Sequence, residues 1–242
     1  MQSLTIESSP RFYARLAGAI YLLIILFGGF SEGYVMNTLV VSGDPAATAH
    51  NIMASSTLWR FSVAGDLIVP LIAVPQLWII YHLLKPAGRE LALLFVLLEI
   101  VSLSVESVSK LFLLLVLPML ENAGYGHVFQ SQQLFALTGM ILSAHDTCFD
   151  IALLFFGADC LVTGYLIFRS GYFPRLIGLL LQLAGLSYLI GTLSVFFAPA
   201  LASMISLPVQ LLALIGEASF CLWLLVMGVN VPKWNERLGR AA

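Results

Sequence analysis

Six long apolar stretches, separated by short polar breaks, dominate the pattern of hydrophobic and polar positions along the chain. A helix crosses the hydrocarbon core of a bilayer with about 20 residues, and each stretch is at least that long. The pattern therefore predicts an all-α fold, a polytopic membrane bundle of six transmembrane helices in one domain that covers residues 1–242. The expected spans are approximately 15–37, 61–84, 91–119, 133–169, 175–198 and 207–230.

The basic residues alternate between crowded and nearly empty polar breaks. Cytoplasmic segments of membrane proteins retain Lys and Arg, whereas translocated segments carry few of them. Three of the connections between spans hold no basic residue except Arg60. The alternation predicts that both ends of the chain lie in the cytoplasm. The crowded segments contain Arg11 and Arg15, Lys85 and Arg89, Arg169 and Arg175, and finally Lys233, Arg237 and Arg240.

The composition indicates that lipid, and not water, is the solvent of this chain. Hydrophobic residues occupy 60% of the 242 positions and charged residues only 10%, against roughly 25% charged residues in soluble domains. The formal net charge of −2 lacks the basic excess that is typical of nucleic-acid binding. Cys148, Cys160 and Cys221 all fall inside expected spans, which favours small core residues over a disulfide framework.

Two segments beside the spans carry further structural signals. Asp44 is a typical helix N-cap and Pro45 suits the first helical position, so we expect a short helix on the outer surface in the first outer loop. The segment 133–144 is apolar enough to be an outer extension of the fourth span or a re-entrant piece. The pattern does not decide between these two structures.

Five of the six expected spans carry a carboxylate at a similar depth. Counted at ~1.5 Å per residue from the basic residues at the inner helix ends, these side chains lie roughly 18–28 Å along their helices. A charge in hydrocarbon costs at least about 2.5 kcal/mol near a helix centre, so such a layer needs an explanation. We interpret it as a cavity on the outer side that admits a cation or proton and includes Lys110. The five acids are Glu32, Asp66, Glu106, Asp150 and Glu217.

Two pairs of ionisable residues are expected inside the bundle. Glu106 and Lys110 are four residues apart with the acid first, which is the favourable order for an ion pair on one helix face. Glu99 and Asp159 each lie about 15 Å from an inner basic residue, near the midplane. If these two carboxyl groups meet, they share a proton, either as a proton relay or as a structural hydrogen bond. Helical geometry leaves open whether they face each other.

A metal site is an alternative interpretation of the outer polar residues. His145, Asp146 and Asp150, with Glu106, offer nitrogen and oxygen ligands for a divalent cation. The sequence has no HExxH pattern, and its spans offer no further histidine except His82 near an inner end. A hard, oxygen-liganded ion is therefore expected in preference to zinc. No other cofactor is expected.

Four runs of sequence carry a family resemblance: GDPAATAHNI with the nearby LWRFSVAGDLI, then FFGADCLVTGYLIFRSGYFPRLIG, and GEASFCLWLLVMGV. They resemble an uncharacterised prokaryotic family of multi-span membrane proteins, domain of unknown function 4386. The likeness extends from about Arg15 to Val229. It implies a multi-pass protein of a prokaryotic cytoplasmic (inner) membrane, and it supplies no activity, substrate or catalytic residue.

Three functions from different classes are compatible with these residues. We expect a small transporter or binding protein, and not an enzyme, in which a small cation, an amine or a proton enters the acidic cavity. The outer carboxylates and the midplane acid pair favour this function. An intramembrane metal-dependent enzyme and an assembly or regulatory partner without a ligand are the alternatives. The lipid bilayer is the partner that the composition requires, and the oligomeric state is left open.

Overall fold

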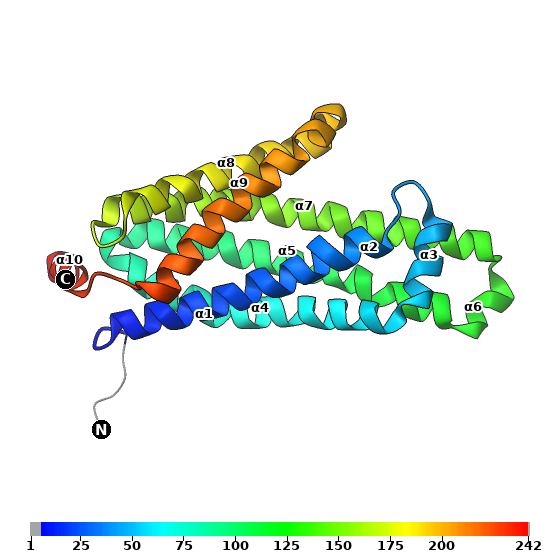
Figure 1. Ribbon diagram of the computed structural model, residues 1–242, viewed down its shortest axis with the longest axis horizontal. Helices are drawn as coiled ribbons and strands as arrows, with labels where there is room; N and C mark the ends of the chain where they lie inside the picture. Colours follow the sequence, from blue (N-terminus) through cyan, green and yellow to red (C-terminus); the bar gives the residue numbers. More distant parts are fainter. Residues whose placement is uncertain (1–5, 242) are drawn as a thin grey trace, which may run out of the picture. The chain divides into compact units, whose positions relative to one another are not determined.

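The computed structural model describes residues 6–241, which are almost entirely helical and contain no β-strand (Figure 1). Within these residues, six helical segments are long and apolar enough to cross a membrane. The predicted all-α class with six spans is therefore confirmed, while the direction of insertion stays a prediction. The spans are Pro10–Leu39, Ser56–Ala87, Arg89–Glu121, Ser131–Ser170, Arg175–Phe197 and Pro199–Val226.

The first span changes its winding part-way along. α1 (Pro10–Gly28) passes into a π-helical segment, η1 (Gly29–Met36), and then into a last helical turn, α2 (Asn37–Leu39). Glycine stands on both sides of the first junction, and glycine is a poor α-helix former. A π-helix is rare and is found frequently at functional sites. The hydrophobic pattern gave no indication of this segment.

The segments beside the spans are helical. α3 (Pro45–Ala54) begins where Asp44 accepts a hydrogen bond from the backbone N–H of Ala47 at 2.9 Å, so the expected short helix and its N-cap are confirmed. α6 (Ala123–Val128) is a second short helix. α7 (Ser131–Ser170) is continuous. The segment 133–144 is consequently a helical extension and not a re-entrant piece.

The remaining helices are α4 (Ser56–Leu84) with a 3₁₀ turn η2 (Lys85–Ala87), α5 (Arg89–Glu121), α8 (Arg175–Phe197), α9 (Pro199–Val226) and α10 (Val231–Ala241). The predicted boundary of the last span, 207–230, is the least accurate. α9 begins at Pro199, a first-turn position at which proline is tolerated. The helix continues through Pro208, because proline is also tolerated inside a membrane helix. It ends before Gly228, whose φ of 67° is left-handed.

The described chain forms two compact units. The first unit comprises the residues up to Leu23, Ile72–Leu103 and the residues from Ile151 onward, and the second unit comprises Ile24–Leu71 and Ser104–Asp150. α1, α4, α5 and α7 contribute residues to both units, whereas α8, α9 and α10 belong to the first. The single domain that the sequence predicts stays a prediction.

Close helix packing characterises the first unit, in which α8 and α9 run side by side (Figure 1). A Cβ atom added at Gly178 of α8 would lie 2.5 Å from the carbonyl oxygen of Gly164 on α7. One added at Gly216 of α9 would lie 2.6 Å from the Cβ of Ala184 on α8. Small residues at such crossings allow backbones to approach, which favours helix association in lipid.

An apolar core gives the second unit its shape. It joins the end of the first span to α3, α4, α5 and α7, and thereby fixes the backbone positions of the polar side chains described below. The core residues are Val35, Leu39, Ile52, Trp59, Val63, Leu113, Val116, Leu117 and Leu142.

Candidate functional site

A buried lysine on α5 is the centre of the candidate site in the second unit. The side chain of Lys110 is only 1% exposed, and its Nζ lies 2.6 Å from Oε1 of Glu32 and 3.6 Å from Oδ2 of Asp66. Nζ also lies 4.6 Å from the ring centre of Phe149, at a distance typical of a cation–π contact. A buried charge is stable only with such partners. Lys110 therefore connects α5 to η1, α4 and α7.

Two hydroxyl groups complete the surroundings of Asp66. Ser31 donates a hydrogen bond to Oδ2 of Asp66 at 2.5 Å, and since its single hydrogen is used there, it accepts from Ser62 at 2.7 Å. All three residues are buried. Ser31 precedes Glu32 directly in η1, so two consecutive residues reach the cluster. A π-helix has more residues per turn than an α-helix, and neighbouring side chains therefore diverge less.

His145 on α7 is the fourth ionisable member of this cluster. Its Nδ1 lies 3.1 Å from the backbone oxygen of Ser109, and because a carbonyl group only accepts, Nδ1 must carry a hydrogen. Its Nε2 faces Oε1 of Glu32 at 3.4 Å. Lys110 donates to that same oxygen. One carboxylate oxygen is thus approached by two cationic or potentially cationic groups.

We refer to Glu32, Asp66, Lys110 and His145 as the buried tetrad. Three further acids lie within electrostatic reach of it. Glu106 on α5 interacts with all four members, and Asp146 and Asp150 on α7 interact with His145. Asp146 is exposed and the other two are half-buried. Six of the sequence-predicted polar residues of the second unit therefore gather around His145.

Glu106 and Lys110 interact electrostatically, as their spacing predicts, but Glu106 is not among the acids that pair with Lys110 within 4 Å in the described residues. Among the ion pairs within 4 Å that the described residues form, Lys110 pairs with Glu32 and Asp66. Helical spacing correctly puts Glu106 near Lys110, but it takes no account of other helices. The flexible lysine stem reaches across to η1 and α4, where Glu32 accepts a hydrogen bond from Nζ and Asp66 forms an ion pair with it at 3.6 Å.

Glu217, the fifth acid of the predicted outer layer, belongs to the first unit. Its carboxylate accepts a short hydrogen bond from the hydroxyl of Tyr188 on α8. The hydroxyl of Tyr21 on α1 donates to its other oxygen at 3.5 Å. Two phenol donors are a suitable environment for a carboxylate in a membrane. A cavity shared by all five acids involves both units and stays a prediction.

The midplane acids also lie in the first unit. Asp159 on α7 interacts electrostatically with Glu99 on α5, and the hydroxyl of Thr163 donates to Oδ1 of Asp159 at 3.5 Å. The two helices thus bring these carboxyl groups near each other, a point that helical geometry alone left open. Their use as a proton relay stays a prediction.

No group of three or more His, Cys, Asp or Glu side chains among residues 6–241 is arranged to hold a metal ion. The suggested ligands His145, Asp146 and Asp150 do not form such a group, because the imidazole of His145 is directed at Ser109 and Glu32.

The family described as "Domain of unknown function (DUF4386)" matches residues 16–228. The chain belongs to the DUF4386 family. An uncharacterized protein of Archaeoglobus fulgidus is 24% identical over 168 residues, which are 69% of this chain and 84% of that protein. No solved structure matches the chain. The DUF4386 match contains the whole buried tetrad, and it identifies a family of proteins with apolar helices without assigning an activity.

Three members of the site in this DUF4386 chain were not singled out by sequence reasoning. Ser62 lies four residues before Asp66, and Phe149 lies four residues after His145, so each shares a helix face with a residue that was singled out. That spacing is a usable signal. Ser31 gave none, since its position depends on the π-helical winding of η1. Short hydroxyl side chains are also common in membrane helices for packing alone.

Proposed function

We propose that this protein is a small membrane transporter or binding protein that exchanges a proton for a small cation at the buried tetrad. The observation that carries the proposal is the contact of His145 with Glu32. A hydrogen on Nδ1 is already committed to Ser109. Nε2 therefore either carries a second hydrogen or presents a lone pair to a carboxylate oxygen at 3.4 Å. The second hydrogen makes this contact attractive, so we place an exchangeable proton on His145.

Charge balance supports an exchange in preference to simple binding. Lys110 and a protonated His145 carry two positive charges, and Glu32 and Asp66 carry two negative charges. The tetrad is neutral with this proton and has one net negative charge without it. A net charge in a low-dielectric site is costly unless it is compensated. Loss of the proton is therefore favourable when a cation arrives, and loss of the cation is favourable when the proton returns.

The surrounding acids give a cation places to bind. Glu106, Asp146 and Asp150 add three carboxyl groups within electrostatic reach of the tetrad, and Lys110 alone does not offset them. A monovalent metal ion, or the ammonium group of an amine, that binds among these carboxylates would replace the positive charge of the departing proton. The acids that interact with His145 are Glu32, Asp66, Glu106, Asp146 and Asp150, and Lys110 shares Oε1 of Glu32 with it.

Access to the tetrad is most direct at Glu32. Its side chain is 25% exposed, whereas those of the other three members are almost fully buried. Glu32 also contacts both Lys110 and His145. A cation that approaches Glu32 therefore weakens the contact that stabilises the proton on His145. The basic residues of the sequence predict that this end of the spans faces away from the cytoplasm.

Proton release on cation addition tests the proposal. Purified protein in a weakly buffered detergent solution with a pH-sensitive dye is titrated separately with Na⁺, K⁺, Mg²⁺ and methylammonium chloride. We expect at least one of these cations to release up to one proton per chain from the parent protein. Glu32→Gln and His145→Gln should abolish the release. Glu121→Gln, which removes an exposed acid paired with Arg60, is the matched control and should retain it.

Two results would contradict the proposal. One is the absence of proton release with all four cations from folded protein. The other is a release that persists in both tetrad variants. Reconstitution into liposomes with the dye inside then separates transport from binding, because only a transporter converts an imposed cation gradient into a sustained change of internal pH.

A further inference from the structure

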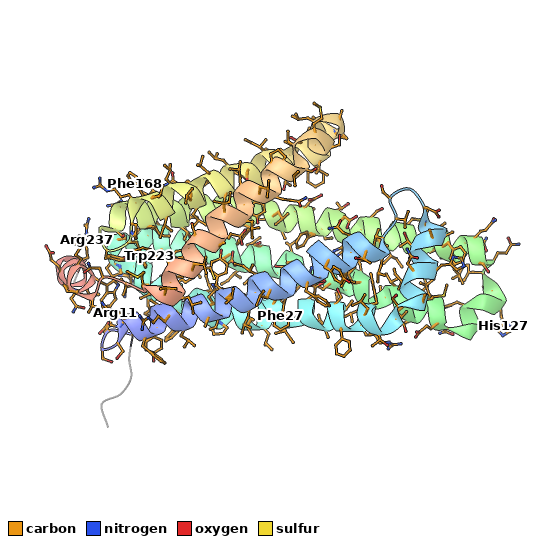
Figure 2. The ribbon with its side chains drawn as sticks, in the orientation of Figure 1. Arg11, Phe27, His127, Phe168, Trp223 and Arg237 are labelled. Atoms are coloured by element: carbon orange, nitrogen blue, oxygen red, sulfur yellow. The ribbon has the colours of Figure 1, made fainter. Side chains whose placement is uncertain are left out.

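A pocket of about 600 Å³ lies in the first unit, where the start of α1 meets the end of α9. Three segments far apart in the sequence form it: the first turn of α1, the turn between α7 and α8, and the stretch from the last turn of α9 through the link to the start of α10. Figure 2 labels two of its residues, Arg11 and Trp223, at the end of the first unit that also holds α10. The pocket is separate from the polar groups around Glu217, Glu99 and Asp159.

The pocket combines apolar walls with basic side chains. Phe173, Met227 and Val229 supply apolar surface, while Arg11 and Lys233 supply the two positive charges. Neither basic residue forms an ion pair within 4 Å with any acid in the described part of the chain. The lining therefore suits a ligand that is anionic at one end and apolar at the other.

Trp223, whose side chain lines the pocket, carries a buried donor without an acceptor in the described part of the chain. The indole Nε1 of Trp223 is buried and has no hydrogen-bond partner among residues 6–241. Leaving such a donor unsatisfied costs about 1–3 kcal/mol. Trp234, by contrast, is buried on α10 and donates its Nε1–H to the backbone oxygen of Leu83 at 3.1 Å. The ring of Trp223 lines the pocket, but its Nε1 is buried away from the pocket surface, so a ligand oxygen reaches it only if neighbouring side chains move.

The conformation of the link holds Arg11 at the pocket. Gly228 has a φ of 67°, which favours glycine, and a Cβ atom there would lie 3.0 Å from Cγ of Arg11. The aliphatic part of the arginine thus packs against the link. Its guanidinium group is the part that remains for an anion, and guanidinium binds phosphate oxygens in a bidentate geometry.

The position of the pocket identifies the class of ligand. It lies where two membrane spans end and where α10 follows with Lys233 and Arg237, as in helices that lie in the headgroup region. Anionic lipids are concentrated in the cytoplasmic leaflet, and basic pockets at this depth bind their headgroups. We propose that this pocket binds an anionic phospholipid, whose phosphate contacts Arg11 and Lys233 and which lies beside the ring of Trp223.

Quenching of tryptophan fluorescence tests this proposal in purified protein. Phosphatidylglycerol and phosphatidylcholine with brominated acyl chains are titrated into protein in detergent. We expect phosphatidylglycerol to quench at a much lower concentration than phosphatidylcholine. Arg11→Gln and Lys233→Gln should each raise its half-maximal concentration roughly tenfold, since a charge-assisted hydrogen bond contributes about that factor. Trp223→Phe should remove most of the quenched signal.

Arg89→Gln is the matched control, because Arg89 is an exposed basic residue at the start of α5 that does not line the pocket. It should behave as the parent protein. Size-exclusion profiles identify any variant that fails to fold, and the exposed Lys233 then serves as the variant of choice. Equal quenching by both lipids, or equal effects of Arg89→Gln and Lys233→Gln, would overturn the proposal. Inorganic phosphate that prevents quenching at millimolar concentration would overturn it in favour of a free phosphate ligand.

Discussion

Replacing Lys110 with methionine removes the central charge of the buried tetrad and keeps a long, unbranched side chain. The lost contacts are the 2.6 Å hydrogen bond to Glu32, the 3.6 Å ion pair with Asp66 and the cation–π contact with Phe149. A hydrogen bond between charged groups contributes about 1.5–3 kcal/mol. Because the buried Asp66 loses the cation that lies within 4 Å of it, we expect a total loss of about 3–5 kcal/mol in the free energy of unfolding.

A double-mutant cycle in detergent micelles apportions this loss between the possible partners of Lys110. Unfolding is followed by tryptophan fluorescence as the fraction of denaturing detergent rises. We expect a coupling energy of about 1.5–3 kcal/mol between Lys110→Met and Glu32→Gln. The coupling between Lys110→Met and Glu106→Gln should be smaller, because these two side chains form no ion pair within 4 Å among the described residues.

Arg60→Met provides a control with similar geometry and different burial. Arg60 pairs with Glu121 at 2.7 Å, but their side chains are 63% and 44% exposed. Exposed ion pairs contribute roughly 0–1 kcal/mol, so this change should cost little. Two results would contradict this prediction: a loss of unfolding free energy for Lys110→Met no larger than that for Arg60→Met, or a stronger coupling of Lys110 to Glu106 than to Glu32.

Two further predictions concern packing and topology. Gly178→Leu should destabilise the protein by about 1–3 kcal/mol or prevent its folding, because a side chain there meets the backbone of α7. Gly239→Leu should be tolerated, because the space around Gly239 is open. Chemical unfolding of both variants measures the difference. A reporter that functions only in the cytoplasm should be active when fused after Ala242 and inactive when inserted near Asn122, and the reverse pattern or activity at both sites would contradict the predicted topology.

The spans could be predicted because lipid imposes a strong constraint on sequence. A helix in hydrocarbon needs an uninterrupted apolar run, so runs and breaks mark the helices even without any knowledge of packing. The cap at Asp44 and Pro45 was predictable for a similar reason, since it depends on residues within one turn. The start of α9 was not, because proline at position 208 interrupts a soluble helix but is tolerated inside a membrane helix.

The candidate site was predictable as a set of residues and not as a set of contacts. Counting depth along each helix brought out Glu32, Asp66 and Glu106, because charge in a membrane is rare. The choice of partner for Lys110 depends on how η1 and α4 are rotated about their helix axes, and that rotation cannot be derived from a single sequence. The contact of Ser31 with Asp66 depends on the π-helical winding of η1, for which the apolar pattern carries no signal. Depth along a helix likewise does not tell which unit holds Glu217, since that depends on helix packing.

The protonation state of His145 tests the proposed proton site most directly. Nitrogen NMR of protein labelled at histidine reports which ring nitrogens carry hydrogen, and the His145→Gln variant assigns the signal among the four histidines. We predict a ring with hydrogen on both nitrogens in the parent protein and on Nδ1 alone after Glu32→Gln, because the carboxylate that stabilises the second hydrogen is gone. A ring with its single hydrogen on Nε2, or one that Glu32→Gln leaves unchanged, would contradict a proton held between His145 and Glu32.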